Sequence, residues 1–206
     1  MEQRQRRRRE RWVVLAVLAA VGLAVPPGRV RAAMPGEFVD APPSLAVPAG
    51  HTPYLSADAV GTQNYICLPS ASGVAWVHVG PQATLFGRGT RQLTTHFLDV
   101  NPMEGVARAA WQHSVDSSRV WARAVASSSD PAWVAPGAVP WLLLETMGAD
   151  GGPRGRGQLA GTSYIQRVQT SGGVAPAVGC AQAADVGARA FVPYTTVYVF
   201  YRPAGR

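Results

Sequence analysis

The sequence contains no lysine, and all 19 of its basic residues are arginine. Charged residues of both signs make up only 15% of its 206 residues, against about 25% in an ordinary globular domain. Together with a hydrophobic share of 47%, this low charge excludes a chain that is disordered throughout, despite 22 glycines and 17 prolines. The length is that of one domain, or at most two.

Positive charge is scarce outside the N-terminus. Eight of the arginines precede position 32, where Glu2 and Glu10 are the only acids. From Ala33 onward, 11 arginines face 10 acidic residues, so the formal charge of +7 falls to +1. The remaining chain lacks the excess of basic residues that binds phosphate backbones, and nucleic acid is not an expected partner.

The N-terminus has the layout of a secretory signal peptide. Six arginines within residues 4–11 precede an apolar run at 12–25, and a Pro-Pro-Gly break at 26–28 and a Val-Arg-Ala cleavage motif follow. The apolar run has 14 residues, fewer than the roughly 20 that a membrane-spanning helix needs. We therefore expect residues 1–32 to be a signal peptide and the protein to be exported, periplasmic or extracellular. Membrane contact is then limited to this segment. An uncleaved N-terminal membrane anchor is the alternative.

Cysteine is rare: Cys67 and Cys180 are the only two, and both lie in the part expected to be exported. A lone pair in an oxidising compartment usually forms a disulfide, so we predict a Cys67–Cys180 bond, with two buried free thiols as the alternative. The four histidines never stand at i, i+4, and no Cys-x-x-Cys motif occurs. No metal site is therefore predicted.

Helical periodicity is also missing. Residues 33–60 are rich in proline and predict an extended arm, and residues 61–203 predict a β-rich exported domain. A short helical turn within 98–108 is the one exception we expect. The fold class is all-β: a single antiparallel β-sandwich or barrel-like domain of about eight strands. The predicted strands are 62–68, 74–79, 94–98, 110–115, 119–126, 139–147, 163–170 and 195–201.

Two of these runs are apolar on both faces. Residues 140–144 read Pro-Trp-Leu-Leu-Leu, without any polar alternation. Residues 195–201 place apolar or aromatic side chains on each side of the strand. Both strands are expected to be buried on both faces.

A hairpin is predicted around residues 116–118. A two-residue turn separates an apolar face from a polar one, and the polar face carries Trp121 between Arg119 and Arg123. This trio could bind a sugar ring or an anionic polymer. The same pattern fits two arginine stems that cover an exposed ring. The apolar face would hold Trp111, His113, Val115, Val120, Ala122 and Ala124.

Catalytic motifs are nearly absent. Gly161 opens no nucleophile elbow, because the second glycine is missing, and Gly155 and Gly157 are not followed by a glycine at dinucleotide-binding spacing. No cofactor is therefore predicted. His96 and Asp116 are the catalytic candidates, although a core histidine and a turn aspartate explain them equally well.

The chain resembles a family of secreted bacterial and fungal proteins catalogued as a domain of unknown function, number 3455. The most specific phrase is Tyr-Ile-Gln-Arg-Val-Gln-Thr-Ser-Gly-Gly at 164–173, followed by Gly179-Cys180 and by Val-Pro-Tyr-Thr at 192–195. The resemblance covers residues 45–201 and implies export, a β-rich domain and paired cysteines. It carries no catalytic residues, and Gln166 and Arg167 within its phrase are further binding candidates. Ser117 stands where the family has glycine, and the link at 98–109 is longer than usual. The other matching stretches are 45–50, 61–67, 96–97, Trp111, 116–118 and 139–144.

Two functional hypotheses follow. The first is a non-catalytic module that binds a ligand or a surface, with a glycan or another envelope protein as partner. The alternative is a hydrolase-like secreted enzyme that uses His96 and Asp116. A pocket that joins these two residues to Gln166 and Arg167 would favour the enzyme, and a flat aromatic face around Trp121 would favour binding.

Overall fold

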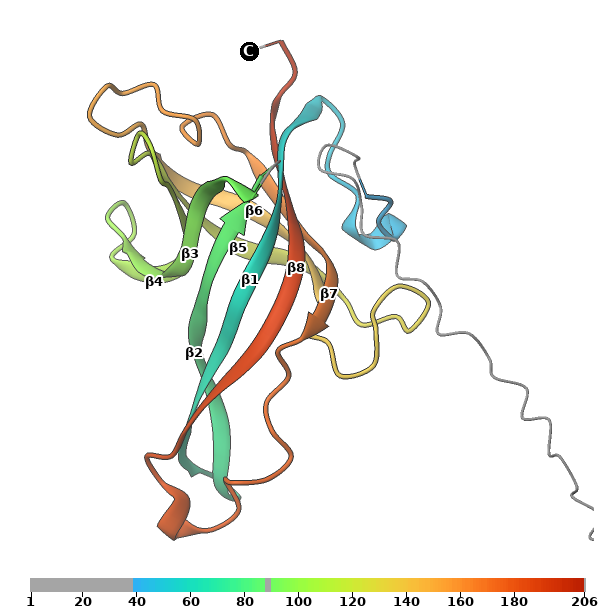
Figure 1. Ribbon diagram of the computed structural model, residues 1–206, viewed down its shortest axis with the longest axis vertical. Helices are drawn as coiled ribbons and strands as arrows, with labels where there is room; N and C mark the ends of the chain where they lie inside the picture. The colour runs from blue at the N-terminus through green and yellow to red at the C-terminus, as the bar shows by residue number, and fades with distance from the viewer. Residues whose placement is uncertain (1–38, 88–89, 206) are drawn as a thin grey trace, which may run out of the picture. The chain divides into compact units, whose positions relative to one another are not determined.

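A computed structural model describes residues 39–87 and 90–205 (Figure 1). The chain forms eight antiparallel strands in sequence order, and β8 pairs with β1 to close a barrel. Of the 3-10 helices within the described residues, η1 (Pro43–Leu45) precedes β1 and η3 (Ala183–Asp185) lies in the β7–β8 connection. The strands are β1 (His51–Ser70), β2 (Gly73–Phe86), β3 (Gln92–Asn101), β4 (Val106–His113), β5 (Arg119–Ser128), β6 (Trp141–Asp150), β7 (Tyr164–Gly172) and β8 (Arg189–Pro203).

The predicted all-β class is confirmed. Because β8 pairs with β1 and closes the sheet, the fold is a barrel and not a sandwich. Each of the eight predicted runs overlaps one observed strand. The strands are longer than their apolar runs, and β1 begins at His51, so residues 51–60 belong to the barrel rather than to an arm. The helical turn expected within 98–108 is a single turn after β3, which runs to Asn101: the N–H groups of Glu104 and Gly105 donate to the Asn101 carbonyl oxygen at 3.1 and 2.8 Å, and Gly105, at φ 68°, leads into β4. The predicted signal peptide lies outside the described residues.

The barrel is buried on both faces along part of its wall. Inside, Trp111, Ile165 and Phe200 form the centre of one apolar cluster. Outside, Leu45 of the N-terminal segment and Val134 of the β5–β6 connection cover Val199 in a second cluster. These layers explain why 140–144 and 195–201 are apolar on both faces, as predicted.

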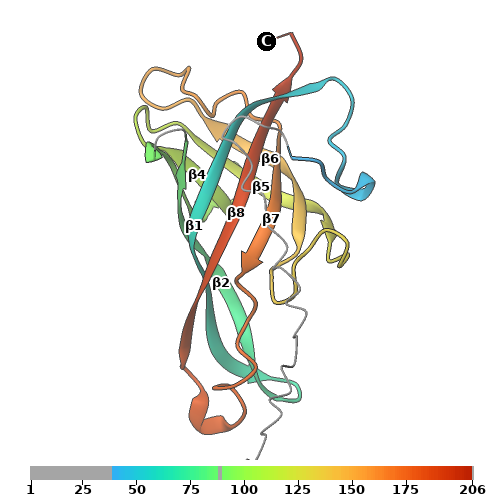
Figure 2. The same ribbon diagram turned by 45° about the vertical axis from the view of Figure 1, so that its right-hand side comes forward.

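The two ends of the barrel differ. At the end near the C-terminus, the β6–β7 loop folds inward and buries Leu159 in the interior cluster (Figure 2). At the other end, β1, β2 and β8 run on beyond the shorter strands as a twisted ribbon (Figures 1 and 2). The long β7–β8 connection returns along this ribbon, and the Cys67–Cys180 disulfide ties it to β1, with the two Cα atoms 5.5 Å apart. The predicted disulfide is thereby confirmed.

Candidate functional site

The barrel encloses a cavity of about 450 Å³. An eight-stranded barrel has an interior just wide enough to be filled by side chains or to hold one small ligand. Here alanines occupy several inward positions of β4 and β5, including the directly paired Ala109 and Ala122, and their small side chains leave the space open. Apart from Arg108 and Arg123, the polar or aromatic lining residues come from six strands: Gln63, His78, His96, Trp111, Arg167 and Tyr198.

His96 forms part of the cavity wall. Its Nδ1 lies 2.8 Å from the carbonyl oxygen of Ala110, so Nδ1 carries the proton and donates it to that oxygen. Burial lowers the pKa of His96 to about 3, despite this bond, and the positive charge of Arg167 adds to the effect. The imidazole is therefore neutral at physiological pH, and its Nε2 is a hydrogen-bond acceptor.

Arg167 supplies the positive charge of the cavity. Its Nε and Nη2 both donate to the carbonyl oxygen of Pro140, at 3.2 and 2.8 Å. No carboxylate of the described chain forms an ion pair with it, and none lines the cavity. The pKa of His78 is lowered, mainly by burial and in addition by the positive charge of Arg167. The charge of Arg167 therefore acts on another residue of the cavity lining. Arg167 thus presents an uncompensated guanidinium.

Several hydrogen-bond donors accompany this guanidinium in the cavity lining. His78 Nε2 donates to Gln63 Oε1 at 2.6 Å, whereas the Gln63 amide nitrogen has only the Tyr194 hydroxyl as a neighbouring partner. The Trp111 indole nitrogen is buried without a hydrogen-bond partner, whereas the Tyr198 hydroxyl interacts with the side chains of Tyr194 and Arg167. Buried polar groups without partners are rare in folded proteins, and such a group is a place to expect water or a ligand.

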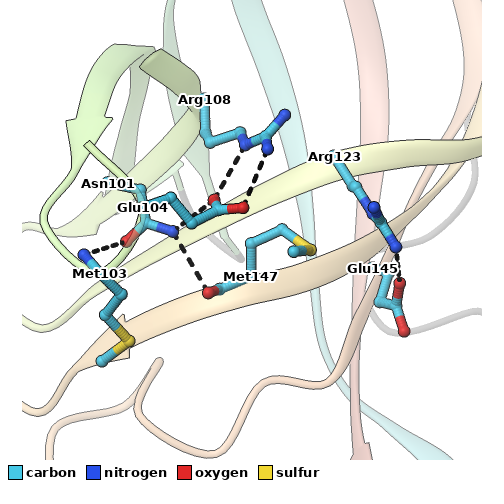
Figure 3. Close-up of polar contacts among 7 residues, drawn as sticks. All are labelled: Asn101, Met103, Glu104, Arg108, Arg123, Glu145 and Met147. Carbon is cyan, nitrogen blue, oxygen red and sulfur yellow. Dashed lines mark hydrogen bonds and ion pairs between the residues drawn. The ribbon is translucent and has the colours of Figure 1, made fainter. Parts of the chain in front are cut away.

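The mouth of the cavity also carries arginines, but these are paired (Figure 3). Arg108 donates from Nε and Nη2 to the carboxylate of Glu104, at 3.0 and 2.9 Å. Arg123 Nη2 donates to Glu145 at 3.1 Å. The same close-up shows Asn101, whose amide nitrogen donates to Glu104 and to the carbonyl oxygen of Met147 on β6. The β3–β4 hairpin is thereby fastened to β6.

Asp116 does not line the cavity with His96. Its carboxylate accepts hydrogen bonds from the Ser118 hydroxyl and from the backbone N–H groups of Ser118 and Gln158. Burial opposes ionisation, but these bonds outweigh it and hold the pKa of Asp116 well below its usual range. His113 Nδ1 lies 3.0 Å from the carboxylate. Asp116 therefore fastens the β6–β7 loop, and the two catalytic candidates are not brought together.

Trp121 is not the exposed ring that the hairpin pattern predicted. Only 4% of it is exposed, because the β3–β4 hairpin folds against it, and its indole N–H donates to Asp99 at 3.0 Å. The Arg119 guanidinium lies 5.6 Å from the Trp121 ring centroid and from that of Phe97, and it pairs with Asp99 at 2.6 Å. Arg123 is separate from this group and belongs to the cavity mouth.

Gln166 and Arg167 are neighbours in sequence but face opposite sides of the barrel wall. Gln166 donates to the carbonyl oxygen of Leu45 and accepts from the Tyr201 hydroxyl, within the outer layer. Arg167 lines the cavity. This split follows from the alternation of side chains along a strand. Gln63, His78, Trp111 and Tyr198 were not among the predicted site residues, since only barrel closure brings them to one cavity.

Two further properties concern the described chain alone. No helix in residues 39–87 or 90–205 is long and apolar enough to cross a membrane. Over the same ranges, no group of three or more histidine, cysteine and acidic side chains is placed to hold a metal ion.

Comparison with known proteins gives one match. Residues 48–202 match the model of a family described as protein of unknown function (DUF3455). No curated protein matches the sequence, and no solved structure matches the fold.

Proposed function

The chain belongs to the DUF3455 family, and we propose that its barrel binds a small amphipathic molecule that carries one anionic group. The observation that carries this proposal is the uncompensated guanidinium of Arg167 in a cavity of about 450 Å³ that no carboxylate lines. This volume lies within the range of roughly 300–1,000 Å³ that is usual for small-molecule sites.

The polar groups around Arg167 favour an anion. The Trp111 indole nitrogen is buried without a partner and can only donate, and the Gln63 amide nitrogen, which also only donates, has no neighbour but the Tyr194 hydroxyl. Arg167 binds the Pro140 carbonyl oxygen through Nε and Nη2 and also interacts with the Tyr198 hydroxyl, but neither partner carries a charge that would neutralise the guanidinium. A carboxylate accepts several hydrogen bonds, and charge-assisted bonds from arginine are the strong ones. A planar carboxylate is therefore the expected head group.

The rest of the cavity favours an apolar tail. Leu142 and Leu144 line one wall, and alanines of β4 and β5 line another. At the mouth, Glu104 and Glu145 already neutralise Arg108 and Arg123 (Figure 3). Among the arginines that line the cavity, only Arg167 lacks an ion-pair partner. The anionic head group of the ligand therefore binds deep in the cavity at Arg167, and its apolar tail extends toward the exposed Leu98.

Calorimetric titration with decanoate and with decanol tests this proposal. Decanoate is expected to bind and decanol to bind at least tenfold more weakly, because decanol has no charge to meet Arg167. Arg167→Gln is expected to abolish the difference. Arg189→Gln, at an exposed position of β8 that does not line the cavity, is the matched control and should bind like the wild type. Equal binding of decanoate by wild type and Arg167→Gln would refute the proposal.

Export is the second part of the proposed function. The Cys67–Cys180 disulfide supports it, since such bonds persist in oxidising compartments. The arginine run and apolar stretch of residues 1–32 support a cleaved signal peptide. Mass spectrometry of the protein from culture medium and periplasm tests this: a mature chain that begins at Ala33 is expected. A chain of full length in the membrane fraction would establish the anchored alternative.

A further inference from the structure

A ring nitrogen of His96 is a hydrogen-bond acceptor that faces the cavity. His96 is 3% exposed, and its Nδ1 proton is committed to the carbonyl oxygen of Ala110. The remaining ring nitrogen, Nε2, carries a lone pair, and no side chain of the described residues donates to it. Nε2 is not one of the fully buried atoms without a partner, and His96 lines the open cavity, so a donor group of a ligand can reach this lone pair.

The imidazole is held rigidly where it meets the cavity. It stacks on Trp111, with ring centroids 4.1 Å apart and an angle of 10° between the planes. The edge of Tyr198 meets it from β8, at 5.1 Å between centroids. A ring fixed on two sides and by a backbone hydrogen bond cannot turn its Nδ1 proton toward the ligand. It presents an acceptor in one direction.

We propose that the ligand is a hydroxy-carboxylate, whose carboxylate binds Arg167 and whose hydroxyl donates a hydrogen bond to Nε2 of His96. This inference rests on the proposed function and names the ligand class of the same cavity. Both residues line that cavity, and they come from β3 and β7 of the closed barrel.

The surroundings favour a hydroxyl over an ammonium group as the donor. His78 lies near the same cavity, and the positive Arg167 influences both histidines. An ammonium group would place a second positive charge beside Arg167, with no carboxylate in the cavity lining to compensate it. A hydroxyl supplies the proton without a charge. A hydroxy acid should therefore bind more tightly than the corresponding amino acid.

The test compares ligands that differ in one group. Decanoate, 2-hydroxydecanoate, 3-hydroxydecanoate and 3-aminodecanoate are titrated into the wild-type protein at pH 7 by calorimetry. The better of the two hydroxy acids is expected to bind about three- to tenfold more tightly than decanoate, the gain of one hydrogen bond. The amino acid is expected to bind more weakly than decanoate. A hydroxy acid that binds no better than decanoate would overturn the inference and leave the proposed function standing, whereas no binding of any carboxylate would overturn the proposed function.

Two variants assign the effect to the ring nitrogen. His96→Phe keeps an aromatic ring against Trp111 but has no acceptor, and it should bind decanoate and the hydroxy acids equally. His96→Gln retains a side-chain oxygen as acceptor and should recover part of the preference. Near-ultraviolet circular dichroism shows whether each variant is folded, and the wild-type comparison stands without either of them. A full hydroxyl preference in folded His96→Phe would contradict the role of His96.

Discussion

His96 and Trp111 face each other directly across the β3–β4 pairing, and their rings stack at a centroid distance of 4.1 Å. Tyr198 meets both rings at their edges, from β8 on the other side of the barrel. Cross-strand aromatic pairs stabilise a sheet, and edge contacts between rings add to that stabilisation. The same three residues thus serve the interior packing and the wall of the cavity. Changes at His96 are expected to alter both stability and binding.

The burial of His96 predicts a loss of stability in acid. Its pKa is lowered from 6.5 to about 3 by burial, so below pH 6.5 the unfolded chain binds a proton that the folded chain excludes. The free energy of unfolding should then fall as the pH decreases from 6.5 toward 3, by up to about 1.4 kcal/mol per pH unit. Urea denaturation between pH 4 and pH 8 measures it. His96→Phe should flatten this part of the profile, and an unchanged slope in that variant would assign the acid sensitivity to another group.

Asp116 is predicted to hold the loop that closes one end of the barrel. Asp116→Ala removes the hydrogen bonds to Ser118 and Gln158 and should lower the free energy of unfolding by about 1–3 kcal/mol. The pKa of Asp116 is depressed, so its contribution is present above pH 3.8 and is lost as the pH falls further. Asp150→Ala, which removes a bond within its own loop, is the matched control and should cost less. Equal losses would show that the link between loops contributes nothing.

The sequence predicted strands well because alternation and turn residues are local signals. The hairpin between β4 and β5 shows this in detail. We expected a two-residue turn, and the structure has four residues between His113 and Ser118. Both turn lengths are even, and a change of register by an even number of residues leaves each side chain on the same face of the strand. Trp111 and Val120 therefore still face the interior, as predicted. The prediction fails near the turn, where Val115 is 70% exposed instead of facing inward, and on the polar face, where Trp121 is buried.

The site could not be predicted in the same way, because it depends on contacts between distant segments. Trp121 reads as an outward residue in its own strand, and it is buried only because Asp99 and the rest of the β3–β4 hairpin fold against it. Gln63 and Arg167 lie more than 100 positions apart and share a cavity only after the barrel closes. No pattern within one strand carries that information. Arg167 was identified, but its sequence neighbour Gln166 faces the other side of the wall.

Because Trp121 is buried, we predict that it contributes to the stability of the fold and not to ligand binding. Trp121→Ala should lower the free energy of unfolding by about 3–5 kcal/mol, the usual cost of deleting a buried tryptophan. Trp133→Ala is the comparison, because Trp133 is 37% exposed and should cost much less. Chemical denaturation of both variants measures the difference. A Trp121→Ala protein of unchanged stability that no longer bound a polysaccharide would reverse this assignment and restore the glycan-binding surface.

The disulfide is predicted to contribute strongly to stability because it closes a long loop. Cys67 and Cys180 are 113 positions apart, and the chain-entropy model gives about 4–5 kcal/mol for a loop of that length. The double variant Cys67→Ala/Cys180→Ala should lose roughly this free energy of unfolding, and the wild type with dithiothreitol should lose the same. Alkylation without reductant should modify neither cysteine. Modification of both in the folded, unreduced protein would show that the bond does not form.

Filling the cavity should separate binding from folding. Ala109→Phe places a large ring at an inward position beside Ala122, where the open volume of about 450 Å³ can receive it. The variant is expected to lose at least tenfold in affinity for decanoate, while its melting temperature changes little, because the ring replaces empty space rather than packed atoms. Ala75→Phe, at an exposed position of β2 that does not line the cavity, should bind like the wild type. Decanoate binding that survives in folded Ala109→Phe would place the ligand outside the barrel, since the ring and the ligand cannot occupy the same volume.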